Sequence, residues 1–390
     1  TFFGKAKDFL SDNCTGPGCK KCGWKVHGDN RTATASSPSA DLKCNPKASP
    51  PESCPGGQPC PASGVCPSVR LKLDEDYAAP VRLFVDPSSG HDRNDGLSAT
   101  SALRSLALAQ QRLRQTLNES SHRSIVVHLL PGRHRVPKGG LLLESGDSTA
   151  DGHGVYWRGR QGATSLSGGE PVTGWKLAGD PTLPKNVYRA PAPAALRGTT
   201  ARHLFVDGLR AVRTRQNASF LGLSLDARCV ACSYSASSAA ALSWSNPSDV
   251  EMVYSGVLAS WAEERCSVES VTAADKGANI TMKQPCFWNL VKGKPLTMGN
   301  ITPAVVENVR EHLKAPGQWY YDKAKAEVLY YPLQGQDLSK ADAILAVEET
   351  LVKHDGAQNH NWHGVTFEYA TWLRPMQGAG YVEAQTGACD

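Results

Sequence analysis

Residues 125–167, IVVHLLPGRHRVPKGGLLLESGDSTADGHGVYWRGRQGATSLS, decide the fold class that this sequence predicts. The stretch holds four short apolar runs, at Ile125–Leu130, Leu141–Glu144, Val155–Arg158 and Thr164–Ser167. Glycine, proline and aspartate separate the runs, and such punctuation is typical of short β-strands that follow one another closely. The stretch therefore predicts an all-β protein.

The residues just before this stretch predict one strand and one helix. Val81–Val85 reads as a short strand, and two turn clusters follow it at residues 86–90 and 94–96. Leucines at positions 103, 106, 108, 113 and 117 then recur at helical spacing. We expect a single early helix that ends near Asn118.

Residues 1–79 form a region of different composition. They hold seven of the twelve cysteines, are rich in proline and glycine, and show almost no periodic apolar pattern. Such a segment cannot bury enough apolar surface to fold on hydrophobicity alone. We expect an arm that disulfides hold together.

Residues 171–335 break the strand rhythm and predict an inserted β-rich domain. Asp207-Gly208 between two apolar runs predicts a two-residue hairpin, and residues 322–327 predict a second hairpin turn. Further strands are expected at Asp249–Tyr254, Cys266–Val271 and Asn279–Met282, and a short helix at Ala304–Leu313.

The strand rhythm resumes in residues 336–390, at Ala343–Val347, Leu351–Lys353 and Val365–Phe367. From Ile344 to Val365 is 21 residues, close to one turn of a parallel β-solenoid, in which each turn stacks on the last. The pattern favours a solenoid, with a β-sandwich as the alternative. Residues 80–170 would then be its cap and first coils, and residues 336–390 later coils that stop short at the C-terminal end.

Cysteines and glycosylation sequons together indicate a secreted, extracellular glycoprotein. The sequons are at Asn13, Asn30, Asn118, Asn217, Asn279 and Asn300. The candidate disulfide cysteines are Cys14, Cys19, Cys22, Cys44, Cys54, Cys60, Cys66, Cys229, Cys232, Cys266, Cys286 and Cys389. Two of the pairs have C-x-x-C spacing, as zinc sites do, but two pairs some 200 residues apart are a weak zinc signal. We expect disulfides, no metal and no cofactor.

The charge pattern gives little support to a nucleic-acid partner. The net charge of +5 is spread along the chain without a run of five basic residues, whereas phosphate binding requires clustered lysine and arginine. Apolar runs also stay well below the roughly 20 residues of a membrane-spanning helix.

Motifs distributed over residues 81–390 carry a family resemblance. They include Leu83–Asp86, Asn94-Asp95-Gly96, Trp244-x-Asn246-Pro247-Ser248-Asp249-x-Glu251, Trp261-x-Glu263-x-Arg265-Cys266, Pro316-Gly317-Gln318-Trp319-Tyr320-Tyr321-Asp322 and Trp372-Leu373-Arg374-Pro375. Together they resemble the N-terminal part of the β-helix proteins of glycoside hydrolase family 141, with their inserted domain. The resemblance implies a right-handed parallel β-helix that acts on polysaccharide. It also implies catalytic acids on later coils, beyond Asp390, so the catalytic residues stay unknown.

Glycoside hydrolysis generally uses two carboxylates, and the chain offers three pairs. Asp249 and Glu251 would share a face of one strand, although a structural or solvated role is the stronger reading. Glu263 and Glu264 are adjacent, so they would diverge on a strand as surface residues. Glu368 lies near Glu383 in the expected coils.

A possible carbohydrate subsite lies near the end of the chain. Trp372 and Tyr381 could stack on sugar faces, while Arg374 and Glu383 could bind hydroxyl groups. The alternative is packing at the corner of a coil, because large aromatic residues also fill cores. Residues 360–363, which have H-x-x-H spacing, are expected to form a turn between strands rather than a zinc site.

Two functions from different classes remain open, and a third reading is carbohydrate binding without hydrolysis, which predicts that Trp372→Ala abolishes glycan binding. The favoured one is the front part of a secreted β-helix protein of glycoside-hydrolase type, with a polysaccharide or glycan as partner and without a complete active site in this segment. The alternative is a non-catalytic structural glycoprotein of a cell wall or surface filament, since a fold does not fix a function. In either case we expect a longer chain, or a partner, to cover the strand edges at the C-terminal end.

Overall fold

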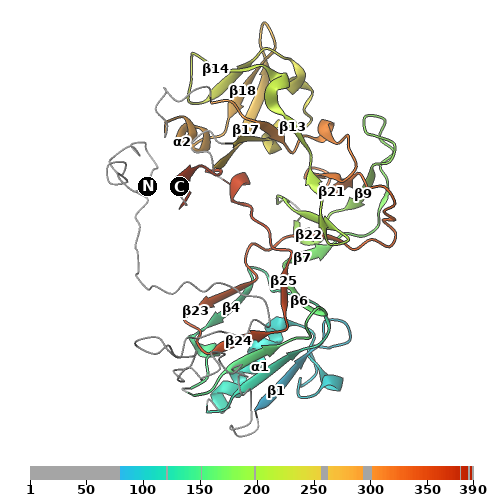
Figure 1. The fold of residues 1–390 in the computed structure, drawn as a ribbon, viewed down its shortest axis with the longest axis vertical. Coiled ribbons are helices and arrows are strands. Elements are labelled where there is room, and N and C mark those ends of the chain that lie inside the picture. The colour runs from blue at the N-terminus through green and yellow to red at the C-terminus, as the bar shows by residue number, and fades with distance from the viewer. Residues whose placement is uncertain are drawn as a thin grey trace, which may run out of the picture.

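The computed structural model describes residues 80–119, 122–150, 152–196, 199–255, 262–292, 301–377, 379–384 and 387–388. The expected N-terminal arm, residues 1–79, lies outside them. The described chain is all-β with few helices, as predicted (Figure 1). Helix α1 (Leu106–Glu119) buries Leu106, Ala109, Leu113 and Leu117 along one face. Helix α2 (Cys286–Lys292) is short, and no helix among the described residues is long and apolar enough to cross a membrane.

Three parallel sheets form one region, at the bottom of Figure 1. The first has the order β1 (Val81–Val85), β2 (Ile125–Leu129), β5 (Val155–Arg158), β24 (His360–His363); the second β25 (Thr366–Glu368), β6 (Thr164–Ser167), β3 (Gly132–Arg135); the third β23 (Val352–Asp355), β4 (Leu141–Glu144). All of these pairings are parallel. From β2 onward the chain visits the three sheets in a repeating order, so each pass adds one strand to each sheet. The four runs of residues 125–167 are confirmed as strands.

The core of this parallel region is apolar. Leu83, Leu143 and Leu166 are fully buried in it, and helix α1 covers β1. Trp157 of β5 is also fully buried and stacks on Trp362 of β24, with ring centroids 4.9 Å apart. Stacking of like residues on successive parallel strands fixes the register between them.

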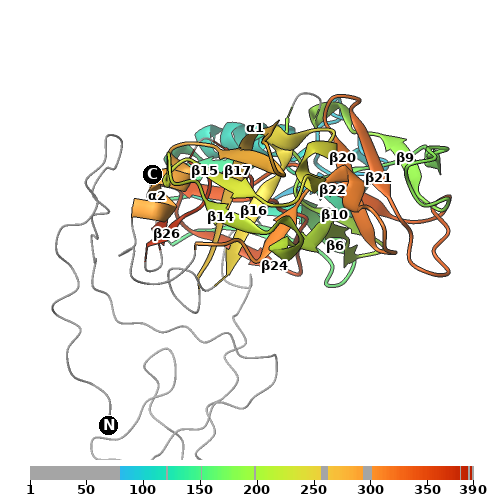
Figure 2. The same ribbon diagram turned by 90° about the horizontal axis from the view of Figure 1, so that it is seen from above.

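Residues between β6 and β23 form three antiparallel or mixed sheets. The largest is seven-stranded, in the order β13 (Arg215–Asn217), β19 (Val305–Glu307), β16 (Glu251–Ser255), β17 (Glu263–Ala273), β18 (Ala278–Met282), β15 (Ser233–Ala236), β14 (Leu223–Leu225). A five-stranded sheet has the order β12 (Val212–Arg213), β20 (Gln318–Asp322), β21 (Glu327–Tyr330), β9 (Tyr188–Pro191), β8 (Lys176–Leu177). A four-stranded sheet has the order β11 (Leu209–Arg210), β10 (Leu204–Val206), β22 (Ala343–Ala346), β7 (Gly169–Pro171). Seen from above, α2 and β15 lie at one end of this region, and β9 and β21 at the other (Figure 2).

Both predicted hairpins of this inserted region are confirmed. Val206 pairs with Leu209 across Asp207-Gly208, and β20 pairs with β21 across residues 323–326. The expected helix at Ala304–Leu313 is wrong. The segment forms strand β19 and then a single 3₁₀ turn, Arg310–His312, because Val305 and Val306 complete the seven-stranded sheet between β13 and β16.

Two expectations about the later coils are also wrong. Residues 360–363 form β24, not a turn, because they extend the parallel sheet beyond β5. The 21-residue interval from Ile344 to Val365 does not measure a coil, because β22 pairs antiparallel with β7 and β10. Parallel pairing resumes at β23. The predicted limits of the domains stay predictions. The change from antiparallel to parallel strand pairing indicates where the inserted region ends.

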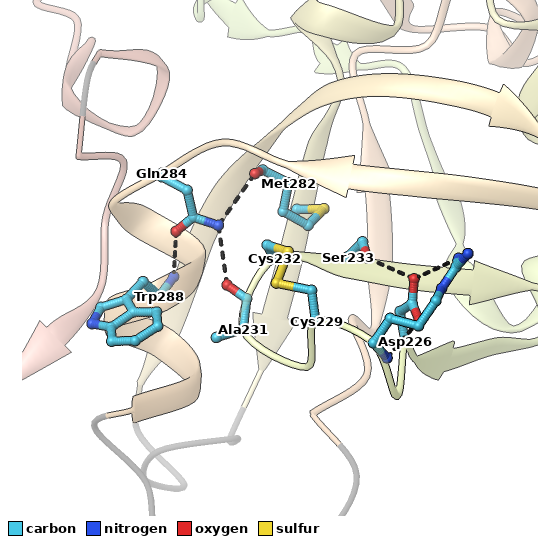
Figure 3. The surroundings of a disulfide bond; sticks show 9 residues. Asp226, Cys229, Ala231, Cys232, Ser233, Met282, Gln284 and Trp288 are labelled. Atoms are coloured by element: carbon cyan, nitrogen blue, oxygen red, sulfur yellow. Dashed lines mark hydrogen bonds and ion pairs between the residues drawn. A yellow bond between two sulfur atoms is a disulfide. The ribbon is translucent and has the colours of Figure 1, made fainter.

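Two disulfides are formed within the described ranges, Cys229–Cys232 and Cys266–Cys286. The first shows that the C-x-x-C pair at residues 229–232 is oxidised rather than offering thiolates to zinc. Beside it, the side-chain amide of Gln284 donates to the backbone oxygens of Ala231 and Met282 and accepts from the backbone N–H of Trp288 (Figure 3). These bonds hold the start of α2 against the disulfide loop. The other eight candidate cysteines lie outside the described residues.

Candidate functional site

The seven-stranded sheet has one apolar face and one charged face. Met252, Cys266 and Val306 are fully buried in the apolar core beneath it. Strand alternation sends their neighbours to the opposite face, where Glu251 of β16 lies directly opposite Glu307 of β19. The next strand continues this row, since Glu307 lies opposite Arg215 of β13.

Arginines from a second layer cover this charged face. Arg202 precedes β10 and Arg213 belongs to β12, and both donate from Nη1 to Oε1 of Glu251, at 2.5 and 2.6 Å. Arg265 of β17 donates from Nη1 to Oε2 of Glu307 at 2.6 Å and lies 3.6 Å from Oε2 of Glu251. Glu251 is fully buried, so its charge is compensated by these guanidinium groups rather than by water.

The titration of this cluster follows from its positive surroundings. Burial alone would raise the pKa of Glu251, but Arg213 and Arg202 outweigh burial and lower that pKa to about 2. Burial lowers the pKa of His203 to about 4, with help from the nearby guanidinium groups of Arg210 and Arg202. Glu251 is therefore a stable anion and cannot serve as a proton donor near neutral pH.

A cavity of about 320 Å³ opens above the cluster. It is lined by Arg202, Arg210, Ala211, Val212, Arg213, Arg215, Glu263, Arg265 and Glu307. We call it the arginine pocket. Five arginines line it, and the neighbouring carboxylates are Glu251, Glu263 and Glu307, so the group carries a net charge of +2.

An aromatic pair adjoins the arginine pocket. The rings of Trp372 and Tyr381 meet edge-on, with centroids 4.8 Å apart, and Trp372 is 40% exposed. Tyr381 and Arg265 exchange both backbone hydrogen bonds, at 2.8 and 2.9 Å. Directly opposed residues of an antiparallel pair project to the same side, so the Tyr381 ring lies on the face that carries the Arg265 side chain. Arg213 also contacts Met376 of the same C-terminal segment, from Nη2 to Sδ at 3.2 Å.

The structure thus brings together two of the four residues of the predicted subsite. Arg374 begins the 3₁₀ turn Arg374–Met376 between the two aromatic residues. Glu383 belongs to β26 (Glu383–Ala384), which pairs with β27 (Gly387–Ala388), and its side chain lies outside the described part. A role in sugar binding stays a prediction for all four.

The predicted carboxylate pairs do not form catalytic pairs among the described residues. Asp249 ends the 3₁₀ turn Pro247–Asp249, where burial raises its pKa, while Glu251 lies in the arginine cluster. Glu368 accepts hydrogen bonds from Ser165 Oγ at 2.6 Å and from Arg133 Nε at 3.1 Å.

The adjacent pair Glu263 and Glu264 does diverge on β17 as predicted. Glu263 is exposed and accepts two bonds from Arg265. Glu264 is fully buried, so its expected surface position is wrong: it lies opposite Tyr254 and shares the core face of the sheet.

The sequence reasoning missed the arginines altogether. Residues 202, 210, 213 and 215 are all arginine, and positions 213 and 215 alternate as on a strand. Four arginines within fourteen residues could have indicated a positively charged site. In the part of the chain that the structure describes, no group of three or more histidine, cysteine, aspartate or glutamate side chains could hold a metal ion.

A comparison with solved structures finds a glycoside hydrolase with a TM-score of 0.61 and 26% sequence identity. The match covers 76% of this chain and 52% of the other, so the chain spans about half the length of that structure. A second match, to the complex of XylC with xylose, has 11% identity, covers 70% of this chain and 32% of that one, and has a TM-score of 0.32, from which nothing follows. No family profile matches the chain, and no curated protein matches it significantly. The chain therefore has a glycoside hydrolase-like fold, and membership of family 141 stays a prediction.

Proposed function

We propose that this chain is part of a secreted, N-glycosylated protein of glycoside-hydrolase type, and that its described residues bind carbohydrate rather than catalyse hydrolysis. The observation that carries the proposal is the arginine pocket with the aromatic pair Trp372–Tyr381 beside it. Sugar sites combine an aromatic surface, which packs on C–H groups, with a few convergent polar groups that fix orientation. The likeness to a glycoside hydrolase structure supports the same conclusion.

The architecture that we propose is a right-handed parallel β-helix of family 141 type, interrupted by an inserted domain. The repeating order of the three parallel sheets supports it, because each pass of the chain adds a strand to every sheet. On this proposal the insertion, predicted at residues 171–335, lies between β6 and β23, and β23 completes the pass that β5 and β6 begin.

A secreted location is proposed from the sequons and the two disulfides. Asn118 and Asn217 are exposed, and Asn279 is half-buried on β18, so these three side chains are accessible to different degrees. Glycan attachment is testable by mass spectrometry of the protein after expression in eukaryotic cells. Unmodified asparagine at every site would contradict the proposal.

Carbohydrate binding is testable with a polysaccharide panel and the Trp372→Ala variant. The control is Trp288→Ala on α2, because Trp288 is 38% exposed and thus matches Trp372 in size and exposure. We expect Trp372→Ala to weaken binding about tenfold, the effect of losing one stacked sugar contact of about 1.4 kcal/mol, and Trp288→Ala to leave it unchanged. Absence of binding to every glycan would instead favour the structural glycoprotein.

A further inference from the structure

We propose that the arginine pocket binds the carboxylate of an acidic sugar, such as a uronic acid unit of a polysaccharide, while the Trp372–Tyr381 pair packs on a neighbouring unit. This inference rests on the proposed carbohydrate-binding function and gives it a substrate class.

The charge of the pocket is not balanced by the protein. Arg202, Arg213 and Arg265 are compensated by Glu251, Glu263 and Glu307. Arg210 makes no ion pair within the described part of the chain, and Arg215 comes no closer than 3.7 Å to Glu307. An anion in the pocket would meet these two exposed guanidinium groups in front and the buried ones behind. Buried arginine groups are less screened by salt and water than surface charges are, so they strengthen the attraction.

The pocket also keeps an unused donor. Arg213 is 7% exposed, and its Nε–H has no hydrogen-bond partner in the described part of the chain. A buried donor without a partner costs free energy unless a ligand or water satisfies it. This donor is buried rather than exposed to the cavity, so an anion in the pocket first meets the exposed guanidinium groups of Arg210 and Arg215.

The geometry favours a carboxylate on a sugar. A guanidinium group presents paired N–H donors that match the two oxygens of a planar carboxylate. The volume of about 320 Å³ lies at the small end of ligand pockets, the size for one monosaccharide unit. The adjoining aromatic pair offers a packing surface for a neighbouring sugar unit, which a free anion would leave unused.

A purely structural salt-bridge network explains less of this arrangement. Such a network needs enough carboxylates to neutralise its arginines, as Glu251 does for Arg202 and Arg213. It gives no role to the exposed Arg210 and only a long contact of 3.7 Å with Glu307 to Arg215, and both of these rim arginines repel the buried guanidinium groups. The rim arginines are thus the residues that separate a binding role from a structural one.

The test is calorimetric titration of the full chain with three probes at physiological salt. The probes are an oligogalacturonate, the same oligomer fully methyl-esterified, and a sulfated oligosaccharide of neutral sugars. The variant is the double change Arg210→Gln with Arg215→Gln. The matched control is Arg82→Gln with Arg93→Gln, two exposed arginines of the parallel region, which lowers the net charge equally.

We expect the oligogalacturonate to bind at least about tenfold tighter than its methyl ester. The double variant Arg210→Gln with Arg215→Gln should lose at least about tenfold in affinity for the oligogalacturonate, because it lacks charge-assisted hydrogen bonds. The control variant keeps the wild-type affinity. Equal binding of the acid and the ester would overturn the inference while leaving the proposed function standing. Preference for the sulfated probe, or an equal loss in the control variant, would overturn the carboxylate assignment. Failure of every glycan to bind would overturn the proposed function itself.

Discussion

The parallel region and the inserted region use opposite solutions for their interiors. In the parallel region the space between the sheets is apolar, and the half-exposed Arg114 pairs with the exposed Glu144 and with the buried carboxylate of Asp147. In the inserted region one face of the seven-stranded sheet packs on an apolar core, while the other buries Glu251 among arginines. A stacked-strand region gains stability from repeated apolar contacts, whereas a buried charged face has a desolvation cost that its ion pairs must offset.

The largest effect that separates the two regions is expected at Glu251. Changing Glu251→Gln removes the only fully buried carboxylate bound to Arg202 and Arg213 among the described residues, and we expect a loss of about 3–5 kcal/mol in the free energy of unfolding. Hydrogen exchange, read separately for the two regions, will locate the loss in the inserted region. The control is Glu263→Gln at the exposed edge of the cluster, which should lower the free energy of unfolding by about 1 kcal/mol or less. Equal losses in both regions would show one cooperative unit and remove the contrast.

A core leucine in the parallel region should cost somewhat less, and through a cavity rather than a charge. Leu166 of β6 is fully buried, so Leu166→Ala is expected to cost about 3 kcal/mol. Leu142→Ala on β4 is the matched control, since Leu142 is 38% exposed and its loss should cost about 0.5 kcal/mol or less. Urea unfolding measures both. Comparable losses for the two leucines would mean that the parallel region lacks a close-packed core.

The parallel region was predictable to a greater extent than the inserted one. Strands at residues 125–167 follow from local alternation and from the turn residues between the runs. The partner of each strand was not predictable, because β24 lies 202 residues after β5 in sequence yet pairs with it directly. Residues 360–363 were expected to form a turn because their distant partner strand, β5, could not be recognised from the sequence.

The arginine pocket depends on the same kind of long-range information. Along β16, Glu251, Val253 and Ser255 share one face of the strand. An ordinary surface strand can carry the same residues on its exposed face, so the sequence pattern cannot show that Glu251 is buried. Burial results from Arg202 and Arg213, which arrive from other sheets. The contact between Trp372 and Tyr381 was within reach of sequence reasoning, because both lie in one short segment.

The stability of the inserted region is expected to depend on pH through His203, which lies beside the arginine cluster. The pKa of His203 is about 4 in the folded protein, owing first to burial and then to the arginines, and its ordinary value is 6.5. The folded state thus binds fewer protons than the unfolded state between these values, so stability falls as the pH falls from 6.5 to 4 and this contribution is constant below 4. His203→Gln should reduce that fall by roughly 1–3 kcal/mol. Unfolding midpoints between pH 4 and pH 7 measure it, and an unchanged slope would contradict the lowered pKa of His203.

The smallest effect is expected where the two regions meet, at Arg133 of β3. Its guanidinium group donates to Asp342, which precedes β22, at 2.6 and 3.1 Å, and to Glu368 of β25 at 3.1 Å. These half-exposed pairs are screened by solvent, so Arg133→Gln should cost about 1 kcal/mol, and a double-mutant cycle with Asp342→Asn isolates the contact between the regions. Lys353→Gln is the control, because its pair with Asp355 lies within one strand and is more exposed. A coupling energy as large as the loss at Leu166 would mean that the contact between the regions stabilises the fold as strongly as their cores do.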